Sequence, residues 1–531
     1  MEAKVQAFDP LDMNNYKIEK LPKLEKSTFE KWMAKMGFPL AIIAFIVLYF
    51  IVDIPFLNNI DPGTLSGDAA KRFSELGAFG FSRANYAMLA VFVSSIILWI
   101  TEPVPNYLTS LIVILAIVLT GITTDKVAYA QLGHPVMWLN ILSFILASML
   151  VKTKVAKRFA LWFVLKFGKN ASMVIFSFIV INIVLSAFIS ATTAKAAILL
   201  PIFMVIAAIY GATGGNNRNN FGRNLVLQNL FQINIGASGF LTGSGANLLS
   251  AALIAGSMGL TTFSYQDWFV AAFPLCMILI LIGWFVGMKI IFPLKDNEKK
   301  PSIEGGMNRL REELNSMGKM KLEEYKAIAI FVGVLLLWAT DKQHGINQTA
   351  VAFIGAVVAL LPGIGVVKWN DVDIPWHLLL FSAGAYTLGA GLEATGLPST
   401  LVGQLFDNLG IGANTPFWVL YAILTAAMLF SALLFQSKTM RALIFVPIAI
   451  GVAQKFGYPI MSLAFPVALL CEHVYVLPFN SKPAALLYTT NHYSWSDTFK
   501  FGMTMMIISW VMILIWGETL LKWLGYTNGL L

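Results

Sequence analysis

The 531-residue sequence has few of the residues that bind metals or form disulfides, with two cysteines and five histidines. Cys276 and Cys471 both lie in apolar segments and form no CxxC pair, so we expect packing residues rather than a disulfide framework or a metal cluster. The sequence also lacks HExxH, GxSxG and Walker strings, and its histidines show no ligand spacing. These absences predict no enzyme active site, no metal site and no cofactor.

Charged residues are also scarce, at 12% of the chain, whereas hydrophobic residues make up 57% and the mean hydropathy is +0.73. That much apolar sequence is enough for roughly ten spans of ~20 residues. The composition therefore predicts an all-α polytopic membrane protein. The first 36 residues have no apolar core, so we expect no cleavable signal peptide and a retained first span from Phe38 to Ile54.

The formal net charge of +9 does not indicate a partner nucleic acid, because the basic residues lie in loops rather than on a stripe with interleaved aromatics. The loops richest in Lys and Arg are 17–35, 152–169, 218–223 and 289–326, and those without them are near 53–69, 261–267 and 403–415. The positive-inside rule places the first set in the cytoplasm. We expect a plasma-membrane protein with a cytoplasmic N-terminus.

The second half of the chain repeats the first. KAAILLPIFMVIAA, which begins at Lys195, aligns without a gap with RALIFVPIAIGVAQ, which begins at Arg441, and Pro201 aligns with Pro447. We expect eleven spans, with five in each repeat and one extra at the N-terminus. Because five is odd, the two repeats must be inverted, and their re-entrant hairpins must enter from opposite faces with tips near the midplane.

The expected organisation has six parts, and each repeat holds one hairpin and one broken helix. A capping box at Ser27 to Glu30 opens an interfacial helix in the first part. Asp267 and Asp497 are expected to be helix N-caps. The six parts are 1–36 (cytoplasmic segment), 37–133 (first scaffold spans), 134–293 (transport part of the first repeat, with a hairpin over 173–209 and a broken helix over 225–254), 294–326 (cytoplasmic linker), 327–374 (second scaffold spans) and 375–531 (transport part of the second repeat, with a hairpin over 417–452 and a broken helix over 460–487).

Each hairpin tip is a hydroxyl-rich break in an apolar stretch, where lipid cannot hydrogen-bond the freed backbone groups. One such string alone would favour packing roles for Ser and Thr, but two in register favour a binding site. The second limb of each hairpin points its free N–H groups and positive dipole end at the midplane, which suits a carboxylate. The broken helices, with Asn247 in the first and Pro478 and Asn480 in the second, supply the rest of the cavity. We expect an anionic substrate.

From about Phe38 onwards the chain resembles the divalent anion:sodium symporter family, whose repeats carry a Ser-Asn-Thr tip ten residues before a Pro and a TPPN-like broken helix. Ser437-Lys438-Thr439 and Ala191-Thr192-Thr193 stand at the two tips. The resemblance implies an elevator-type carrier of C4 or C5 dicarboxylates that forms a homodimer. The expected substrate-binding residues are Thr192, Thr193, Asn247, Ser437, Lys438, Thr439, Pro478 and Asn480.

The chain departs from the family pattern at its cations. Thr192 and Lys438 occupy the positions of the family's Asn, and Lys195 and Arg441 follow them. A sodium ion needs about five or six oxygen ligands, by analogy with the other hard cations, and an ammonium supplies none while it repels the ion. We expect Lys438 to replace a coupling sodium. Lys195 and Arg441 either do the same or neutralise a carbonyl at a hairpin end.

Fixed cations make the return of an empty carrier costly, by several kcal/mol, because their charge is uncompensated in the membrane. A bound dianion removes that cost. The sequence therefore predicts a sodium-independent exchanger of dicarboxylates such as 2-oxoglutarate, malate, succinate or fumarate, as resemblance to the plastid 2-oxoglutarate/malate translocators also implies. The alternative is a sodium-coupled symporter of the same fold. Glu472-His473 either carries a proton, forms a mutual hydrogen bond or caps the helix break.

Overall fold

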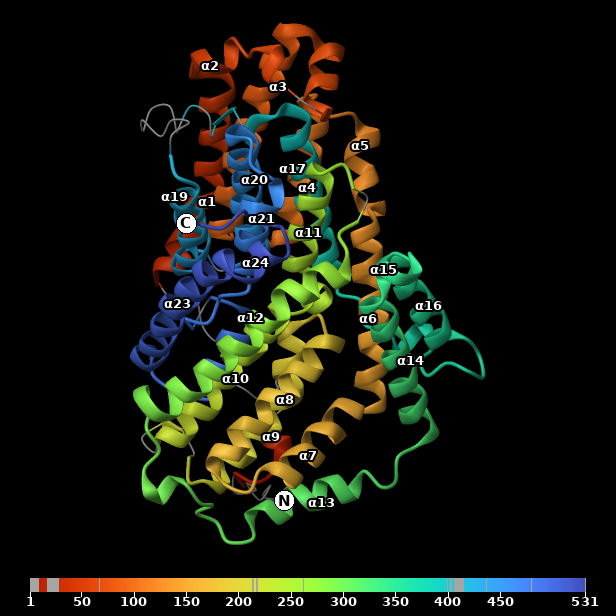
Figure 1. Ribbon diagram of the computed structural model, residues 1–531, viewed down its shortest axis with the longest axis vertical. Coiled ribbons are helices and arrows are strands. Elements are labelled where there is room, and N and C mark those ends of the chain that lie inside the picture. The colour runs from red at the N-terminus through yellow and green to blue at the C-terminus, as the bar shows by residue number, and fades with distance from the viewer. Residues whose placement is uncertain are drawn as a thin grey trace, which may run out of the picture.

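The computed structural model describes residues 9–16, 28–65, 67–212, 214–215, 218–260, 262–398, 400–401, 404, 415–435, 437–478 and 480–530. All regular secondary structure in these residues is helical, which confirms the predicted all-α class (Figure 1). Three predictions fall wholly or partly outside them: the capping residue Ser27, much of the 1–36 segment and most of the 403–415 loop.

Eight helices of the described residues are long and apolar enough to cross a membrane. Three of these eight are limbs of the predicted hairpins, which the prediction of eleven spans counts as re-entrant. That prediction counts instead shorter helices, such as α4 (Asn106–Leu119) and α16 (Gln348–Leu360). These two have 14 and 13 residues and are about 20 Å long, less than the ~30 Å apolar core of a bilayer. The eight are Lys31–Ile51, Gly67–Thr101, Asp125–Thr153, Ala171–Phe188, Thr192–Ile209, Tyr265–Ile291, Lys438–Phe456 and Trp495–Trp523.

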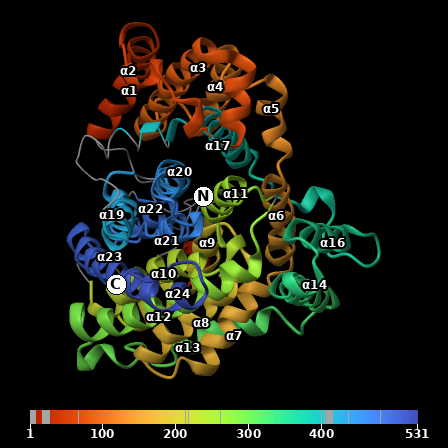
Figure 2. The same cartoon turned by 45° about the horizontal axis from the view of Figure 1, so that its top comes forward.

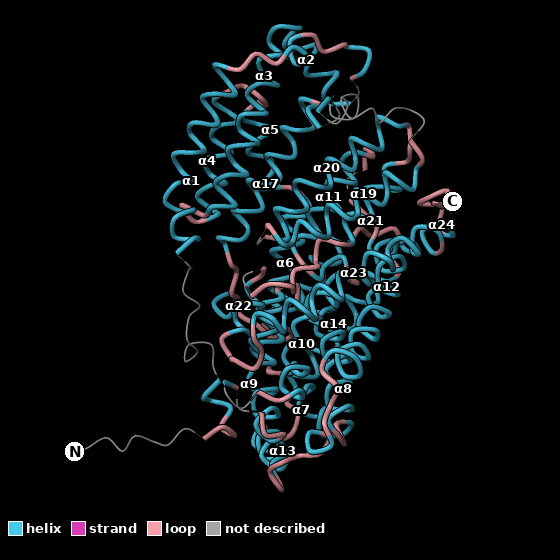
Figure 3. Tube along the Cα trace, turned by 90° about the vertical axis from the view of Figure 1, so that its left-hand side faces the viewer, coloured by secondary structure: helices cyan, strands magenta, loops and turns pink. Residues whose placement is uncertain are grey.

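Two groups of helices lie outside the interrupted ones. Their members are α1 (Thr28–Ile46), α3 (Gly67–Thr101) and α4 in the first group, and α14 (Leu322–Ala339) and α16 in the second. The first group packs against α17 (Trp376–Thr395) of the second repeat (Figure 3). The second group packs against α6 (Pro135–Thr153) of the first repeat (Figure 1). Helices of each repeat thus pack against a helix of the other repeat, so the two repeats share an extensive interface.

These crossings are tight because small residues line them. A Cβ added to Gly384 of α17 would lie 2.3 Å from the Cβ of Ser110 on α4. One added to Gly355 of α16 would lie 2.4 Å from Val334 Cγ2 on α14. Both distances are far below van der Waals contact, so the glycines allow the backbones to approach closely, as is common between membrane helices.

The interrupted helices gather in the middle of the molecule, where α11, α20 and α21 pack together (Figure 2). The predicted hairpins are present as helix pairs, and their second limbs begin at Thr192 and Lys438. The first-repeat elements are α8 (Ala171–Phe188), α9 (Thr192–Ile209), α10 (Asn220–Ser238), the 3₁₀ turn η7 (Leu241–Gly243) and α11 (Gly245–Ser257). The second-repeat elements are α19 (Phe417–Phe430), the 3₁₀ turn η11 (Ser431–Leu433), α20 (Lys438–Phe456), α21 (Ile460–Leu469) and α22 (Lys482–Tyr488).

The first broken helix begins five residues before the predicted Leu225. The Asn219 side chain accepts a hydrogen bond from Gly222 N at 2.7 Å and opens α10 at Asn220. The prediction began at Leu225 because residues 220–224 are mostly polar and continue no apolar pattern. They are nevertheless helical, because the Asn219 cap stabilises this first turn.

The prediction that Asp267 and Asp497 are N-caps is wrong by three residues. Ser264 caps α12 (Tyr265–Val286) and Ser494 caps α23 (Trp495–Glu518), each accepting from the aspartate's backbone N–H. Asp497 also accepts from Ser494 N at 2.8 Å, which completes a capping box. The carboxylates therefore lie in the first turn, where they face the positive end of the helix dipole.

The remaining helices connect or border these parts. They are α2 (Pro55–Asn58), α5 (Asp125–Ala130), α7 (Val155–Phe167), α13 (Gly306–Ser316), α15 (Asp341–His344) and α24 (Leu520–Trp523).

Candidate functional site

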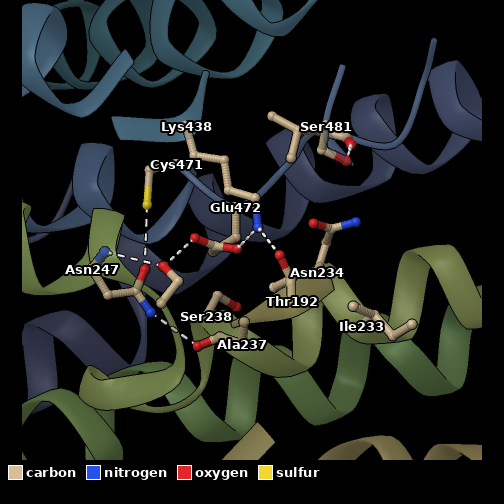
Figure 4. Close-up of polar contacts among 12 residues, drawn as sticks. Thr192, Ile233, Asn234, Ala237, Ser238, Asn247, Lys438, Cys471, Glu472 and Ser481 are labelled. Carbon is tan, nitrogen blue, oxygen red and sulfur yellow. Dashed lines mark hydrogen bonds and ion pairs between the residues drawn. The ribbon is translucent and has the colours of Figure 1, made fainter. Parts of the chain in front are cut away.

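Four interrupted helices each contribute one side chain to a single hydrogen-bonded network, which we call the four-break network. Thr192 begins α9, Ser244 caps α11, Lys438 begins α20 and Glu472 lies in the break after α21. Lys438 Nζ donates to Glu472 Oε2 at 2.5 Å and to Thr192 Oγ1 at 3.3 Å (Figure 4). Ser244 Oγ donates to Glu472 Oε1. One carboxylate therefore links both broken helices and, through Lys438, both hairpin tips.

The local sequence explains how two of these side chains reach the network. Ser437 Oγ accepts from Met440 N at 3.3 Å and starts α20, which leaves Lys438 in its first turn. Ala191 stands at the corresponding start of α9 and has no side-chain acceptor. The adjacent Thr192 hydroxyl bonds across to the other tip instead.

The charges of the network are paired. Glu472 is fully buried and the Lys438 side chain is 14% exposed. The sequence predicts Lys438 as a tethered cation without a counterion, and the ion pair with Glu472 corrects that view. A cation and an anion removed from water together avoid much of the cost that either would incur alone.

The alternatives of a mutual hydrogen bond and of a helix cap for Glu472-His473 are not seen. The carboxylate of Glu472 is engaged by Lys438 and Ser244. In the part of the chain that the structure describes, neither ring nitrogen of His473 has a hydrogen-bond partner, and its ring lies against Tyr475 with centroids 5.8 Å apart.

Arg441 is fully buried beside the network and binds backbone carbonyls. Its guanidinium donates to Ser431 Oγ at 2.9 Å, to Cys471 O at 3.0 Å and to His473 O at 3.3 Å. The C-terminal end of a helix carries the negative end of its dipole. The guanidinium therefore closes the C-terminal ends of α19 and α21 together. Further acceptors are the carbonyl oxygens of Met428, Leu429 and Leu470.

Lys195 makes the equivalent contacts in the first repeat. Its ammonium donates to Ser186 Oγ at 2.9 Å and to Ile233 O at 3.4 Å, and the side chain is fully buried. In both repeats the cation on the second limb thus bonds to a serine near the end of the first limb and to a carbonyl of the broken helix. Neither Lys195 nor Arg441 forms an ion pair with any described residue.

Asn247 and Asn480, which are expected in the site, form hydrogen bonds within the helix breaks instead. Asn247 Nδ2 donates to Ala237 O and Phe240 O, both at 2.9 Å, and Oδ1 accepts from Cys471 Sγ at 3.3 Å. Both asparagines are fully buried. Apart from the contact of Asn247 with the Cys471 thiol, their amides are directed at the main chain of the breaks rather than at the network.

Asn480 is used in the same way. Its Oδ1 accepts from Leu477 N at 2.6 Å, and its Nδ2 donates to Ala432 O in η11. Pro478 is buried beside it, whereas Thr193, Ser437 and Thr439 are half-buried next to the network residues.

Of the predicted site residues, the structure thus joins Thr192 and Lys438 directly. It adds Ser244 and Glu472, which the sequence-based set leaves out. The signal for Glu472 was present, because an acidic residue within an apolar segment is costly and marks a functional position by default. The described residues contain no cluster of three or more His, Cys, Asp or Glu side chains that could hold a metal ion.

A cavity of about 450 Å³ lies away from the four-break network. Residues of α3, α5, α11 and α17 line it, among them Arg72, Glu75 and Glu393, together with His134 at the start of α6. It borders neither hairpin tip. We place the candidate site at the network because four helix ends and a buried ion pair meet there.

Comparisons with known proteins agree with this architecture. Residues 77–527 match the family model described as the sodium:sulfate symporter transmembrane region. The sodium-dependent dicarboxylate transporter SdcS of Staphylococcus saprophyticus is 26% identical over 461 residues, which cover 82% of this chain and 87% of that protein. A membrane protein of Cupriavidus necator is 25% identical over 468 residues, which cover 84% and 89% respectively.

A solved structure shows the same fold at greater sequence distance. The structure of Neisseria gonorrhoeae MtrF matches with a TM-score of 0.51 and 14% identity, over 94% of this chain and 96% of that one. At this identity the likeness concerns the fold alone.

Proposed function

The chain belongs to the sodium:sulfate symporter family of membrane transporters, and we propose that it exchanges dicarboxylates across the plasma membrane without sodium. Candidate substrates are 2-oxoglutarate, malate, succinate and fumarate. The names of the Staphylococcus relatives support a dicarboxylate. The four-break network supports it too, since the positive ends of α9 and α20 meet there beside the Lys438 ammonium, and each suits a carboxylate.

The observation that carries sodium independence is the surroundings of Arg441. In transporters with broken helices, the carbonyls at half-helix ends are the groups that coordinate sodium. Here five carbonyl oxygens and one hydroxyl accept hydrogen bonds from the guanidinium. A hard cation would need about that many oxygen ligands. Arg441 therefore uses the oxygens that sodium would require, and Lys195 holds the equivalent place in the first repeat.

Exchange follows from the charges that stay uncompensated. Glu472 offsets Lys438 in the unloaded state, so Lys195 and Arg441 are the buried cations without a carboxylate partner among the described residues. Moving them through the barrier costs several kcal/mol, and a bound dianion lowers that cost. The loaded carrier should therefore cross much faster than the empty one.

The two outer helix groups suggest how the movement occurs. We assign residues 37–133 and 327–374 to a scaffold, and the hairpins and broken helices to a part that moves as an elevator. The crossed packing of α17 on the first group and α6 on the second supports two such surfaces. The carrier is proposed to be a homodimer with its N-terminus in the cytoplasm.

The test is uptake of labelled succinate into proteoliposomes, with or without succinate inside, in sodium or choline buffer. We expect uptake that needs internal succinate and does not change when choline replaces sodium. Vesicles without protein are the control. The second candidate, sodium-coupled symport, is favoured by the names of the Staphylococcus relatives. A sodium gradient that drives substantial uptake into empty vesicles would establish it and contradict exchange.

A further inference from the structure

Glu472 is placed where a substrate carboxylate would have to bind. Its Oε2 accepts from the Lys438 ammonium at 2.5 Å (Figure 4). Its Oε1 accepts from the Ser244 hydroxyl. If Lys438 binds the substrate, as the proposed function requires, the incoming carboxylate competes with Glu472 for the same ammonium. Before the substrate binds, the Glu472 carboxylate therefore occupies the position beside Lys438 that a substrate carboxylate would take.

Displacing Glu472 leaves its charge without a counterion. The side chain is fully buried, and the Ser244 hydroxyl is its other hydrogen-bond partner in the described structure. An unpaired buried carboxylate costs several kcal/mol. Two substrate carboxylates in the same site add like-charge repulsion, which also disfavours the ionised form. A proton on Glu472 removes both costs.

The neighbouring cations are engaged elsewhere. Arg441 directs its donors at Ser431 and at backbone carbonyls, and Lys195 directs its own at Ser186 and Ile233 O. Neither is within ion-pair distance of Glu472 in the described residues. The titratable or charged groups that interact electrostatically with Glu472 are Lys438 and Arg441 on α20, Lys195 on α9 and the adjacent Cys471. His473 and Tyr475 follow on its own segment, and their rings contact each other.

We propose that a dicarboxylate displaces Glu472 from Lys438, and that Glu472 takes up one proton from solution as its ion pair breaks. An O–H bond forms on Glu472 while a substrate carboxylate replaces it on the ammonium. Release of the substrate reverses both changes. Each bound dicarboxylate thus brings one proton with it. This inference rests on the proposed function, because it needs Lys438 to hold the substrate.

The experiment is calorimetric titration of the purified protein with succinate, at a pH where succinate is fully ionised, in two buffers that differ in protonation enthalpy. The difference between the two heats measures the protons taken up. We expect about one proton per succinate in the wild type and about none in Glu472→Gln. As the pH is raised, the affinity of the wild type for succinate should fall about tenfold per pH unit, as linkage to one proton requires. The affinity of Glu472→Gln should stay constant.

A matched control is Asp267→Asn. This carboxylate also accepts from a lysine, Lys342, at 2.5 Å, but the pair is exposed and lies outside the network. It should take up as many protons as the wild type. The wild-type measurement needs no variant, so it tests the inference even where Glu472→Gln does not fold.

Two outcomes would overturn the inference and leave the proposed function intact: succinate binding to the wild type without proton uptake, or equal uptake by folded Glu472→Gln. Failure of the folded wild type to bind succinate at all would overturn the proposed function as well. The two failures are therefore distinguishable.

Discussion

Lys438 Nζ lies 3.3 Å from Thr192 Oγ1, although 246 residues separate them along the chain. The same shift aligns Pro201 with Pro447, so Thr192 and Lys438 hold equivalent positions of the two repeats. The odd number of spans expected in each repeat predicts a two-fold axis between them, and equivalent positions that touch would lie beside that axis. A dicarboxylate, with one carboxylate at each end, suits a site on such an axis.

Replacing Lys438 should remove most of the substrate affinity. Loss of one partner of a desolvated charge pair costs about 2–5 kcal/mol, so Lys438→Ala should bind succinate roughly 30-fold more weakly or worse. Calorimetric titration measures the change. Lys342→Ala removes a lysine from an exposed ion pair and is the control, with unchanged affinity expected. Wild-type affinity in Lys438→Ala would place this side chain outside the site.

Lys438→Ala should also lower the melting temperature, because it leaves Glu472 buried without its cation. The double variant Lys438→Ala/Glu472→Gln removes both charges and should recover much of that stability, but not the affinity. If the double variant recovered affinity, the weak binding of Lys438→Ala would be due to the unpaired Glu472 carboxylate. Lys438 would then not bind the substrate itself.

Arg441→Ala should create sensitivity to sodium. The substitution leaves the carbonyl ends of α19 and α21 without their donor, at a cost of about 1–3 kcal/mol for each unsatisfied buried group, so the melting temperature should fall. A sodium ion that binds the freed carbonyls would restore stability by mass action. Melting is compared in sodium chloride and choline chloride at equal ionic strength, with the wild type expected to show no difference. A variant equally indifferent to sodium would argue against a sodium-like place for Arg441.

Ser437 and Thr439 should differ in what they contribute. Ser437→Ala loses the cap that accepts from Met440 N, which typically costs about 1 kcal/mol of stability, as well as a hydroxyl for the substrate. Thr439→Ala should weaken succinate binding by a similar ~1 kcal/mol, about fivefold, with less effect on melting. Equal melting temperatures of the two variants would contradict the capping role.

The orientation of the chain can be tested with single cysteines. In a background of Cys276→Ala and Cys471→Ser, cysteines at the exposed Asn59 and Asn297 should react with a membrane-impermeant reagent from opposite sides. The reason is that Asn59 lies in a loop without Lys or Arg, whereas Asn297 lies in the basic linker. Labelling of both from the same side would contradict the proposed topology.

Helix starts at the tips could be predicted to within two residues, from Ala194 and Met440, because local chemistry decides them. The second limbs begin at Thr192 and Lys438, where an apolar run follows a hydroxyl-rich break. The same local rule misplaced the caps at Asp267 and Asp497, since a serine three residues earlier competes for the same N–H groups. It also missed the first turn of α10, where a polar cap forms a helix without an apolar pattern.

Side-chain partners across the breaks could not be predicted. Glu472 and Ser244 are 228 residues apart, and a chain that leaves its helical period has no fixed direction for its side chains. For the same reason Asn247 and Asn480, expected to face the substrate, are directed at the main chain of the breaks.

By itself, then, the sequence determined the membrane class, the repeat and the four breaks, because hydropathy and spacing act locally and are repeated in register. Only the tertiary structure decided that Lys438 has a counterion while Lys195 and Arg441 have none among the described residues. That difference depends on which helix ends meet: the packing of the second hairpin tip against the second broken helix brings Lys438 to Glu472, 34 residues away, while it directs Arg441 at backbone carbonyls.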